Sequence, residues 1–430
     1  MTAHPALIAQ GEQTKKDVIK LAQGMWMAVG FAASNVHMIE GKNSVTIIDT
    51  TETTQAAENI LAEFRKITDK PIGKIILTHS HRDHISGASV FSEGRDVPIV
   101  ASHLFQSDLI DVDEGRIAPN KMLMRRTFMQ FGIGLRDDQR ISLGVGPGDR
   151  PMQGMGAGFI APNEIIYEDG VMDLDGVEVQ LIHAPGETDD HLIVWVPEHQ
   201  VLFCGDNWYH AFPNLYAIRG TAYRDFQKWA DSLSLMAELK PAVLSAGHTR
   251  PVFGQEQVHE VITTTRDAIL HVMQFTSDGM DKGVPLDDIC ATITLPEPLA
   301  SKPWLQEFYG KLSWSARAFA AGTLGWYDGN PTNLASLSTK DRAQKMAALC
   351  GGADKLMDAA EKTEDAQWCL ELCDHLIVLG APAHMKKAQA LKMKVMEKLS
   401  QSEINATARN SYIWAAEELR KLLHDTKGES

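Results

Sequence analysis

The chain has 430 residues, of which 44% are hydrophobic and 23% are charged; this is typical of a globular protein and long enough for two domains. Its formal net charge of −15 disfavours nucleic acid as a partner, because phosphates bind basic surfaces, although bound metal ions would still attract a small anionic substrate. No segment reaches the ~20 apolar residues of a membrane span, and the few scattered cysteines and the lack of a signal peptide lead us to expect a cytoplasmic protein.

Residues 1–265 alternate short β-branched runs with helical stretches. Residues 35–40 and 44–49 are predicted to form a hairpin, and residues 51–67 a helix. A buried strand is predicted over residues 74–78, where it leads directly to a histidine-rich segment. Four further strands and one amphipathic helix are predicted at residues 177–182, 192–196, 201–204, 242–246 and 223–240. This mixture indicates sheets covered by helices.

A glycine-rich stretch runs from Leu143 to Gly158 and contains six glycines. Its spacing matches neither a P-loop nor a dinucleotide-binding fingerprint. We therefore expect a long loop beside the functional site rather than a phosphate cradle.

The pattern changes at about residue 283, where Ala, Leu, Met, Lys and Glu at helical spacing replace the strand signals. Five helices are predicted in this part, at residues 341–350, 353–363, 366–379, 383–399 and 406–423. No repeat of fixed period is present. The sequence thus predicts an α/β catalytic domain over residues 1–265, a connecting segment over 266–282 and an all-α domain over 283–430.

A dense group of metal-ligand residues follows the strand at 74–78, in the order His79, His81, Asp83 and His84. Imidazole nitrogen and carboxylate oxygen suit zinc, and less decisively iron or manganese. The alternative is a polar surface loop with clustered histidines. Four such side chains within six positions, directly after an apolar strand, make that alternative a poor explanation.

Three later strands also end in turns that contain glycine and a residue able to bind a metal. These residues are Glu187, Asp206 and His248. Strand ends that gather at one edge of a sheet sandwich would bring them to the histidine cluster, so we expect a single metal site there.

Together these motifs resemble the metallo-β-lactamase fold, an αββα sandwich. The resemblance implies two metal ions, most simply Zn²⁺, although other divalent metals would also fit. It assigns the ligands in two groups joined by a bridging carboxylate: His79, His81 and Glu187 for the first metal, Asp83, His84 and His248 for the second, and Asp206 between them. Asp83 and Asp206 are the carboxylates to which it gives catalytic roles.

Glu187 stands where most of that superfamily has histidine, and in this it resembles the alkylsulfatase branch. Asn214 and Arg219 follow Asp206 at that branch's spacing and are implied to bind sulfate, with Tyr216 as a further donor in the pocket. The motif at residues 324–331 resembles part of the alkylsulfatase dimerisation domain. The resemblance, over roughly residues 25 to 425, implies a homodimer that cleaves alkyl sulfate esters with a metal-bridging hydroxide.

Two departures from this branch keep alternatives open. Asp206 replaces the usual glutamate, and Trp314 stands where the family has a histidine proposed to act as acid or base. We also find no counterpart of the sterol-carrier-like domain of secreted alkylsulfatases. A two-metal hydrolase of a lactone, thioester, carboxylic ester or phosphoester is therefore the second hypothesis, and a non-catalytic dimerisation protein the third. We expect Arg224 to be structural, and His191 to be structural or to support the metal ligands.

Overall fold

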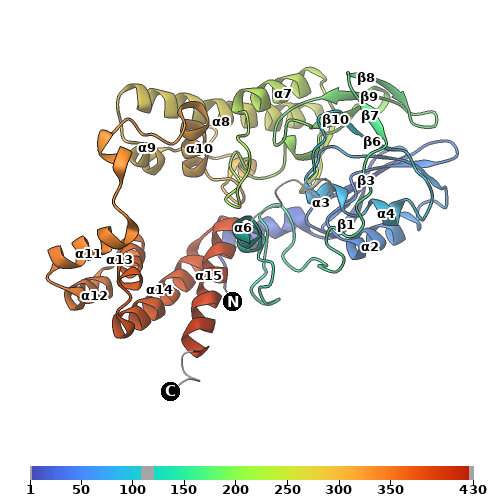
Figure 1. Cartoon of the computed structure of the whole chain (residues 1–430). Helices are drawn as coiled ribbons and strands as arrows, with labels where there is room; N and C mark the ends of the chain where they lie inside the picture. Colours follow the sequence, from blue (N-terminus) through green and yellow to red (C-terminus); the bar gives the residue numbers. More distant parts are fainter. Residues whose placement is uncertain (1, 108–120, 426–430) are drawn as a thin grey trace.

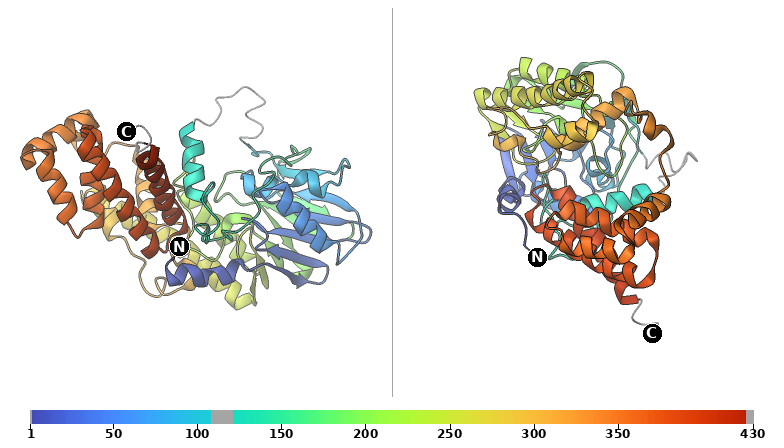
Figure 2. Two further views of the ribbon diagram at one scale, coloured as in Figure 1. Left: turned by 90° about the horizontal axis from the view of Figure 1, so that it is seen from below. Right: turned by 90° about the vertical axis from the view of Figure 1, so that its left-hand side faces the viewer.

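Two β-sheets pack face to face, and helices cover both outer faces (Figures 1 and 2). The computed structural model describes residues 2–107 and 121–425. The first residue of the predicted α/β domain, Met1, and the last residues of the predicted all-α domain, 426–430, lie outside the described residues. Within the described residues the first sheet has seven strands, in sequence order: β1 (Asp17–Ala22), β2 (Met25–Val29), β3 (Val36–Glu40), β4 (Val45–Ile48), β5 (Ile72–Ile76), β6 (Ile99–Ser102) and β7 (Glu164–Ile166).

The second sheet has six strands in the described part of the chain, ordered β13-β12-β11-β10-β9-β8. Their bounds are β8 (Gly170–Asp173), β9 (Glu178–His183), β10 (Leu192–Val196), β11 (Val201–Phe203), β12 (Val243–Ser245) and β13 (Val252–Phe253). Strands β9 and β11 both pair antiparallel with β10, and β12 pairs parallel with β11. The C-terminal ends of β9, β11 and β12 therefore lie at one edge of this sheet.

Strand alternation builds two cores on the first sheet. In β4, Ile47 packs under the outer helices, whereas Ile48 faces the second sheet and packs with Val194 and Phe203. Successive side chains of a strand point to opposite faces, so a strand buried on both sides is apolar throughout. The predicted αββα sandwich is confirmed.

Helices α2 (Thr54–Phe64), α3 (Arg82–Ile85) and α4 (Ala88–Phe91) cover the first sheet. Helices α7 (Phe226–Glu238), α8 (Gln255–Asp281), α9 (Leu286–Thr292) and α10 (Leu312–Leu324) lie on the second sheet side and share one hydrophobic cluster with it. Helix α7 begins after Asp225, whose side chain accepts a hydrogen bond from the Lys228 N–H and so pairs one of the unsatisfied N–H groups of the first turn. The segment 266–282, predicted as a connection, is the second half of α8.

The remaining helices lie beside the sandwich: α1 (Pro5–Gln10), α6 (Lys121–Phe131), α11 (Thr339–Cys350), α12 (Ala353–Lys362), α13 (Ala366–Leu379), α14 (Pro382–Ser402) and α15 (Ala406–Asp425). Helices α11 to α15 form the separate helical bundle drawn in orange and red in Figure 1. Helix α15 packs against α6, where the indole N–H of Trp414 donates to the Ile133 carbonyl at 3.2 Å. Among the described helices, none combines the length and the hydropathy needed to span a bilayer.

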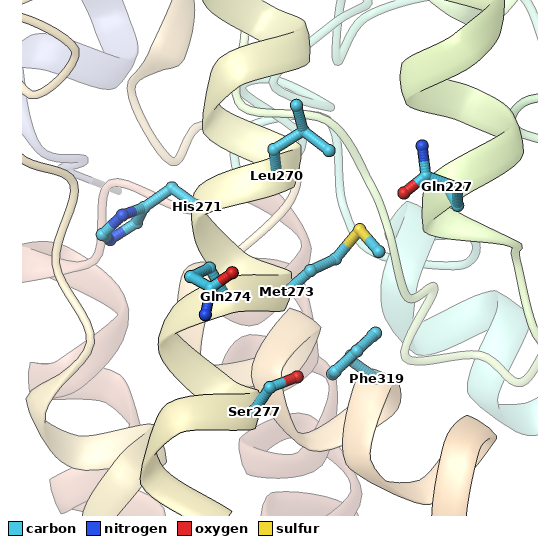
Figure 3. Close-up of a pocket in the computed structure, with 7 residues that line it drawn as sticks. All are labelled: Gln227, Leu270, His271, Met273, Gln274, Ser277 and Phe319. Atoms are coloured by element: carbon cyan, nitrogen blue, oxygen red, sulfur yellow. The ribbon is translucent and has the colours of Figure 1, made fainter.

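The predicted hairpin is present, since β3 pairs antiparallel with β4. The strands predicted at residues 192–196 and 201–204 also pair antiparallel, as β10 and β11. The predicted helical stretches between residues 341 and 423 correspond to α11 to α15 within a few residues. A shallow hollow of about 520 Å³ lies between α7, α8 and α10 (Figure 3). It is lined by Gln227, Leu270, His271, Met273, Gln274, Ser277 and Phe319, none of which is a predicted ligand.

Candidate metal centre

The loops at one edge of the sandwich bring all seven predicted ligands together. His79 and His81 follow β5, and Asp83 and His84 belong to the short helix α3. The other three ligands each follow a strand of the second sheet: Glu187 after β9, Asp206 in the 3₁₀ turn η3 (Gly205–Asn207) after β11, and His248 after β12. The common edge explains why residues so distant in sequence meet.

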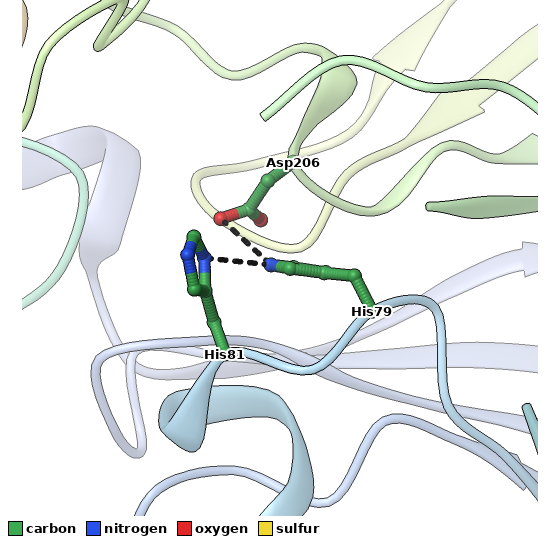
Figure 4. A group of neighbouring side chains, drawn as sticks. All are labelled: His79, His81 and Asp206. Atoms are coloured by element: carbon green, nitrogen blue, oxygen red, sulfur yellow. Dashed lines mark hydrogen bonds and ion pairs between the residues drawn. The ribbon is translucent and has the colours of Figure 1, made fainter. Parts of the chain in front are cut away.

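The first group of side chains surrounds His81. Its Nδ1 lies 3.0 Å from His79 Nε2 and 3.8 Å from Glu187 Oε1. The Oδ2 of Asp206 lies 3.8 Å from His79 Nε2. Figure 4 shows both imidazoles and the Asp206 carboxylate turned toward one point.

The second group surrounds Asp83. Its Oδ2 lies 3.7 Å from His84 Nε2 and 3.5 Å from His248 Nε2. The Asp206 carboxylate reaches this group as well, with Oδ1 3.4 Å from His84 Nε2 and Oδ2 3.1 Å from His248 Nε2. Asp206 therefore lies between the two groups, as a bridging ligand would.

These side chains fit divalent cations. Within each of two groups, His79–His81–Asp206 and Asp83–His84–His248, one ligand atom per residue lies within 4.8 Å of the others. The atoms His84 Nε2, Glu187 Oε2 and Asp206 Oδ1 are buried and have no hydrogen-bond partner among the described residues. Buried polar atoms are normally paired, so unpaired lone pairs that converge indicate two cation positions.

The carboxylates of Asp83 and Asp206 favour positive charge on the neighbouring histidines. Burial lowers the pKa of His248, but Asp206 and Asp83 outweigh burial and raise that pKa to about 9. The pKa of His84 is also raised well above its ordinary value, against burial, by the same carboxylates. Burial lowers the pKa of His79 and leaves its ring neutral. Divalent ions would replace the protons that otherwise balance these carboxylates.

Further hydrogen bonds orient the ligands from behind. His84 Nδ1 lies 2.8 Å from Asp49 Oδ2, so that its Nε2 faces the cluster. His248 Nδ1 donates to the Ala33 carbonyl at 2.7 Å. The backbone N–H of Asp206 donates to His191 Nε2 at 3.0 Å. Such bonds fix the tautomer and the direction of a metal-binding ring.

The backbone around the centre is under local strain. Asp49 and Thr249 adopt positive φ angles of 60° and 64°, which residues other than glycine rarely adopt and which cluster at functional sites. A Cβ added to Gly247 would lie 2.3 Å from Asp206 Oδ1 and 2.7 Å from His84 Cε1. The close approach of this turn to two ligands therefore requires glycine.

The predicted anion-binding residues lie in the turns that follow Asp206. Arg219 Nη2 is 3.4 Å from His81 Nε2, and the Arg219 backbone N–H donates to the Gln130 side chain at 2.9 Å. Asn214 is buried, and its backbone N–H donates to the Tyr209 hydroxyl at 2.7 Å. Tyr216 lies half-buried in the same segment as Asn214. Arg219 is thus the residue of this set that reaches the histidine cluster.

Sequence reasoning missed the role of Arg224. Its side chain is only 2% exposed, and Nη1 lies 2.7 Å from Glu187 Oε1 and also donates to the Asn214 carbonyl. The expectation of a structural residue is therefore incomplete, because Arg224 balances the charge of a predicted metal ligand. Its position five residues after Arg219 was the only signal in the sequence.

Of the aromatic residues around Trp314, only some lie near the centre. Tyr309 stacks edge-on against Tyr209 with ring centroids 5.7 Å apart, and Tyr209 lies 5.9 Å from the His248 ring. Trp304 instead donates its indole N–H to Thr264 at 2.9 Å and belongs to the core over α8. Trp314 is half-buried at the start of α10, below the Lys311 ammonium group.

Comparisons with known proteins agree with this geometry. Residues 29–248 match the family model of the metallo-beta-lactamase superfamily, and residues 286–422 match the model named alkyl sulfatase dimerisation. A linear primary-alkylsulfatase from a Pseudomonas species is 33% identical over 89% of this chain and 73% of that protein. The chain belongs to the alkylsulfatase family of the metallo-β-lactamase superfamily.

Two further relatives show how far the likeness to alkylsulfatases extends. The alkyl/aryl-sulfatase BDS1 of Saccharomyces cerevisiae is 31% identical over 98% of this chain and 66% of its own length. The solved structure of the stereoselective inverting sec-alkylsulfatase Pisa1 from Pseudomonas superimposes with a TM-score of 0.87 at 28% identity, covering 97% of this chain and 68% of Pisa1. The likeness includes the helical part as well as the sandwich.

Proposed function

We propose that this protein hydrolyses alkyl sulfate esters to an alcohol and inorganic sulfate, with two zinc ions at the seven-ligand centre. The observation that carries the proposal is the convergence of those ligands with Arg219, whose guanidinium lies 3.4 Å from His81. A guanidinium fork pairs well with a tetrahedral oxyanion. The relatives named alkylsulfatases support sulfate as that anion.

The residues of the centre have distinct roles in this proposal. When bound, two zinc ions would lower the pKa of water held between them to about 7 and so supply a nucleophile near neutral pH. Asp206 joins the two ligand groups and fixes their spacing. Asp83, whose side chain is 28% exposed, is the carboxylate that can meet a water molecule entering from solvent. Arg219, with Asn214 and Tyr216 beside it, orients the sulfate group.

We infer that water attacks carbon rather than sulfur. Pisa1 is described as an inverting enzyme, and inversion requires that the C–O bond breaks, since attack at sulfur leaves the carbon configuration unchanged. Sulfate is a stable leaving anion that needs no proton donor, so this route tolerates Trp314 in place of the family histidine. Hydrolysis in ¹⁸O-water should therefore place the label in the alcohol, and label in sulfate would contradict the inference.

The direct test is an assay of the zinc-loaded protein with a series of short and long, primary and secondary alkyl sulfates. We expect sulfate release that a strong chelator abolishes and that Zn²⁺ restores. Absence of release across the whole series would reject the proposal. Metal analysis should give two ions per chain, and fewer than one would favour the non-catalytic alternative.

A second candidate keeps the metals and changes the bond. Trp314, at the position of the family histidine, is the departure from the alkylsulfatase pattern that keeps a lactone, thioester, carboxylic ester or phosphoester as candidate substrates. A panel of these esters at equal concentration separates the candidates. Turnover of any of them that exceeds turnover of every alkyl sulfate would favour this second function.

We also propose a homodimer. The segment between α10 and α11, residues 325–338, is exposed along its length and carries apolar side chains. Leu324, Trp326 and Leu334 are 68%, 76% and 61% exposed. A contiguous exposed apolar patch marks an interaction site, and the segment lies inside the region that matches the dimerisation model.

A further inference from the structure

Arg224 has more hydrogen-bonding capacity than its observed neighbours use. Nη1 lies 2.7 Å from Glu187 Oε1 and donates to the Asn214 carbonyl. The Nε and Nη2 atoms are buried and have no hydrogen-bond partner among the residues described. A guanidinium carries five N–H donors, and leaving buried donors unpaired is costly. The unpaired Nε and Nη2 groups of Arg224 therefore indicate an acceptor outside the described residues, such as a bound anion.

A second unmatched contact lies close to the first. If His81 binds a metal through Nδ1, the atom that faces His79 at 3.0 Å, its Nε2 carries the proton. The Nη2 of Arg219 then lies 3.4 Å from another donor rather than from an acceptor. Two donors this close are satisfied together when they share one anion oxygen.

These two sets of donors belong to the same place. Arg219 lies against His81, and Arg224 lies against Glu187, whose Oε1 is 3.8 Å from His81 Nδ1. Arg224 also lies near Arg219: burial and then the positive charge of Arg224 lower the pKa of Arg219. Arg224 is buried and Arg219 is half-buried, so negative charge between them would stabilise both guanidiniums, and the Glu187 carboxylate contacts Arg224.

We infer that Arg224 is a second guanidinium of the sulfate site, and that its Nε and Nη2 groups bind sulfate oxygens beside Arg219. The inference rests on the proposed function and adds a residue to it. It also explains why Arg224 contacts a metal ligand: the same side chain neutralises Glu187 through Nη1 and receives the anion through its other edge.

The charge of the product makes this second guanidinium useful. Water first loses a proton to solvent, and hydroxide and R–O–SO₃⁻ then give R–OH and SO₄²⁻. The bond between carbon and the ester oxygen breaks with its electron pair left on sulfate, and a new bond forms between carbon and the hydroxide oxygen. The leaving group gains negative charge as the bond breaks, so Arg224 interacts more strongly with the departing sulfate than with the ester. It favours bond cleavage and also product inhibition.

The experiment compares Arg224→Lys with the wild type, both loaded with zinc and tested with inorganic sulfate as the ligand. Lysine keeps a positive charge near Glu187 but lacks the fork. We expect two zinc ions per chain in both proteins and a Kd for sulfate raised roughly tenfold or more in Arg224→Lys, the usual effect of losing a charged hydrogen bond. Arg65→Lys is the matched control, because Arg65 pairs with Glu93 at 2.7 Å far from the site; its sulfate affinity should not change.

Two outcomes would overturn the inference. One is an unchanged sulfate Kd in Arg224→Lys. The other is loss of zinc from that variant with normal sulfate affinity once excess zinc is added, since Arg224 would then serve only Glu187. Should the variant fail to fold, the wild type still provides a test. It should bind the sulfate dianion more tightly than the methanesulfonate monoanion, and equal affinities would contradict two guanidiniums.

This result is independent of the enzymatic assay. If the wild-type protein binds inorganic sulfate through Arg224 but releases no sulfate from any alkyl sulfate, the proposed function is rejected and the anion site is supported. If the wild-type protein hydrolyses alkyl sulfates and Arg224→Lys keeps full affinity for inorganic sulfate, the proposed function is supported and the role of Arg224 is rejected.

Discussion

Asp190 lies directly behind the histidine motif. It is buried, and Ser80, between His79 and His81, donates hydrogen bonds to it from its side chain and backbone. Desolvation by burial outweighs these bonds and raises the pKa of Asp190 to about 6. A carboxyl whose pKa is higher in the folded state than in the unfolded state stabilises the fold below the unfolded pKa of about 4. That stability is lost as the pH rises through about 6.

Replacing Asp190 by Asn removes this titration. The free energy of unfolding of Asp190→Asn, relative to wild type, should therefore increase by about 2 kcal/mol between pH 4 and pH 8, as expected for a shift of roughly two pKa units discounted for solvent relaxation. Urea unfolding at both pH values measures the difference. Parallel curves of stability against pH for the two proteins would show that Asp190 ionises freely in the folded state.

His191 supports Asp206 and is not itself one of the predicted metal ligands. Its Nε2 accepts the Asp206 N–H at 3.0 Å, and its ring stacks on His79 with centroids 4.9 Å apart. Burial lowers the pKa of His191 to about 3, so the ring stays neutral and Nε2 remains an acceptor throughout the working range. The histidine therefore holds the backbone of Asp206, the predicted bridging ligand, by a hydrogen bond that does not titrate.

The variant His191→Phe should keep the stacking and lose the acceptor. Residues that orient metal ligands typically contribute 10- to 100-fold in metal affinity, so we expect zinc to bind about tenfold or more weakly in a chelator competition. His191→Gln is the control, since its amide oxygen can accept the Asp206 N–H. Equal zinc affinities for His191→Phe and wild type would rule out this supporting role.

At the scale of elements, the strands and the ligands at their ends could be predicted, because each has a local signature. The alternation in residues 35–49 predicted β3 and β4, and ligand residues directly after apolar runs predicted the common edge. Arg224 could not be predicted in the same way. Its contact with Glu187 depends on the path of the loop before α7, which brings together residues 37 positions apart without any periodic pattern. Residues 266–282 were predicted only as a connecting segment, and that most of them continue α8 was not predicted.

The glycine-rich loop is anchored by a buried ion pair that connects it to the centre. Arg150 Nε donates to Glu52 Oε1 at 2.7 Å, and that oxygen also accepts the Ala33 N–H at 3.0 Å. The Ala33 carbonyl in turn accepts His248 Nδ1 at 2.7 Å. The loop thus lies beside the candidate metal centre and is connected to the predicted ligand His248 through a chain of three hydrogen bonds.

Glu52→Gln should be destabilising because it leaves the buried Arg150 uncompensated. Removing one member of a buried pair typically costs about 3 kcal/mol or more, whereas removing both charges leaves no buried charge uncompensated. We therefore expect the double variant Glu52→Gln, Arg150→Met to be more stable than Glu52→Gln alone in urea unfolding. If the loss of stability in the double variant equals the sum of the losses in the two single variants, the ion pair has no coupling energy.

At the scale of the whole molecule, the chain consists of a sandwich that carries the metal centre and a bundle joined to it in two ways. Residues 325–338 cross from α10 to α11 along an exposed path that includes the 3₁₀ helix η5 (Pro331–Ala335), and α15 returns to pack on α6 (Figures 1 and 2). Arg125 of α6 pairs with Glu418 of α15, so the bundle is held to the catalytic part at its far end. The connecting segment itself is left with its apolar side chains facing outward.

A second copy of the chain would cover that segment, and Trp326 is its largest exposed side chain. Exposed tryptophans at the centre of an interface typically contribute 2 kcal/mol or more to binding. The variant Trp326→Ser should therefore weaken dimerisation by about 30-fold or more, which light scattering coupled to size-exclusion chromatography over a dilution series would detect.

Tyr167→Ser is the matched control, because Tyr167 is 71% exposed but lies just after β7, on the sandwich. Trp326 has no contact with a ligand residue, so zinc content should stay at the wild-type value. A dimer of unchanged affinity in Trp326→Ser would place the interface on another face of the bundle.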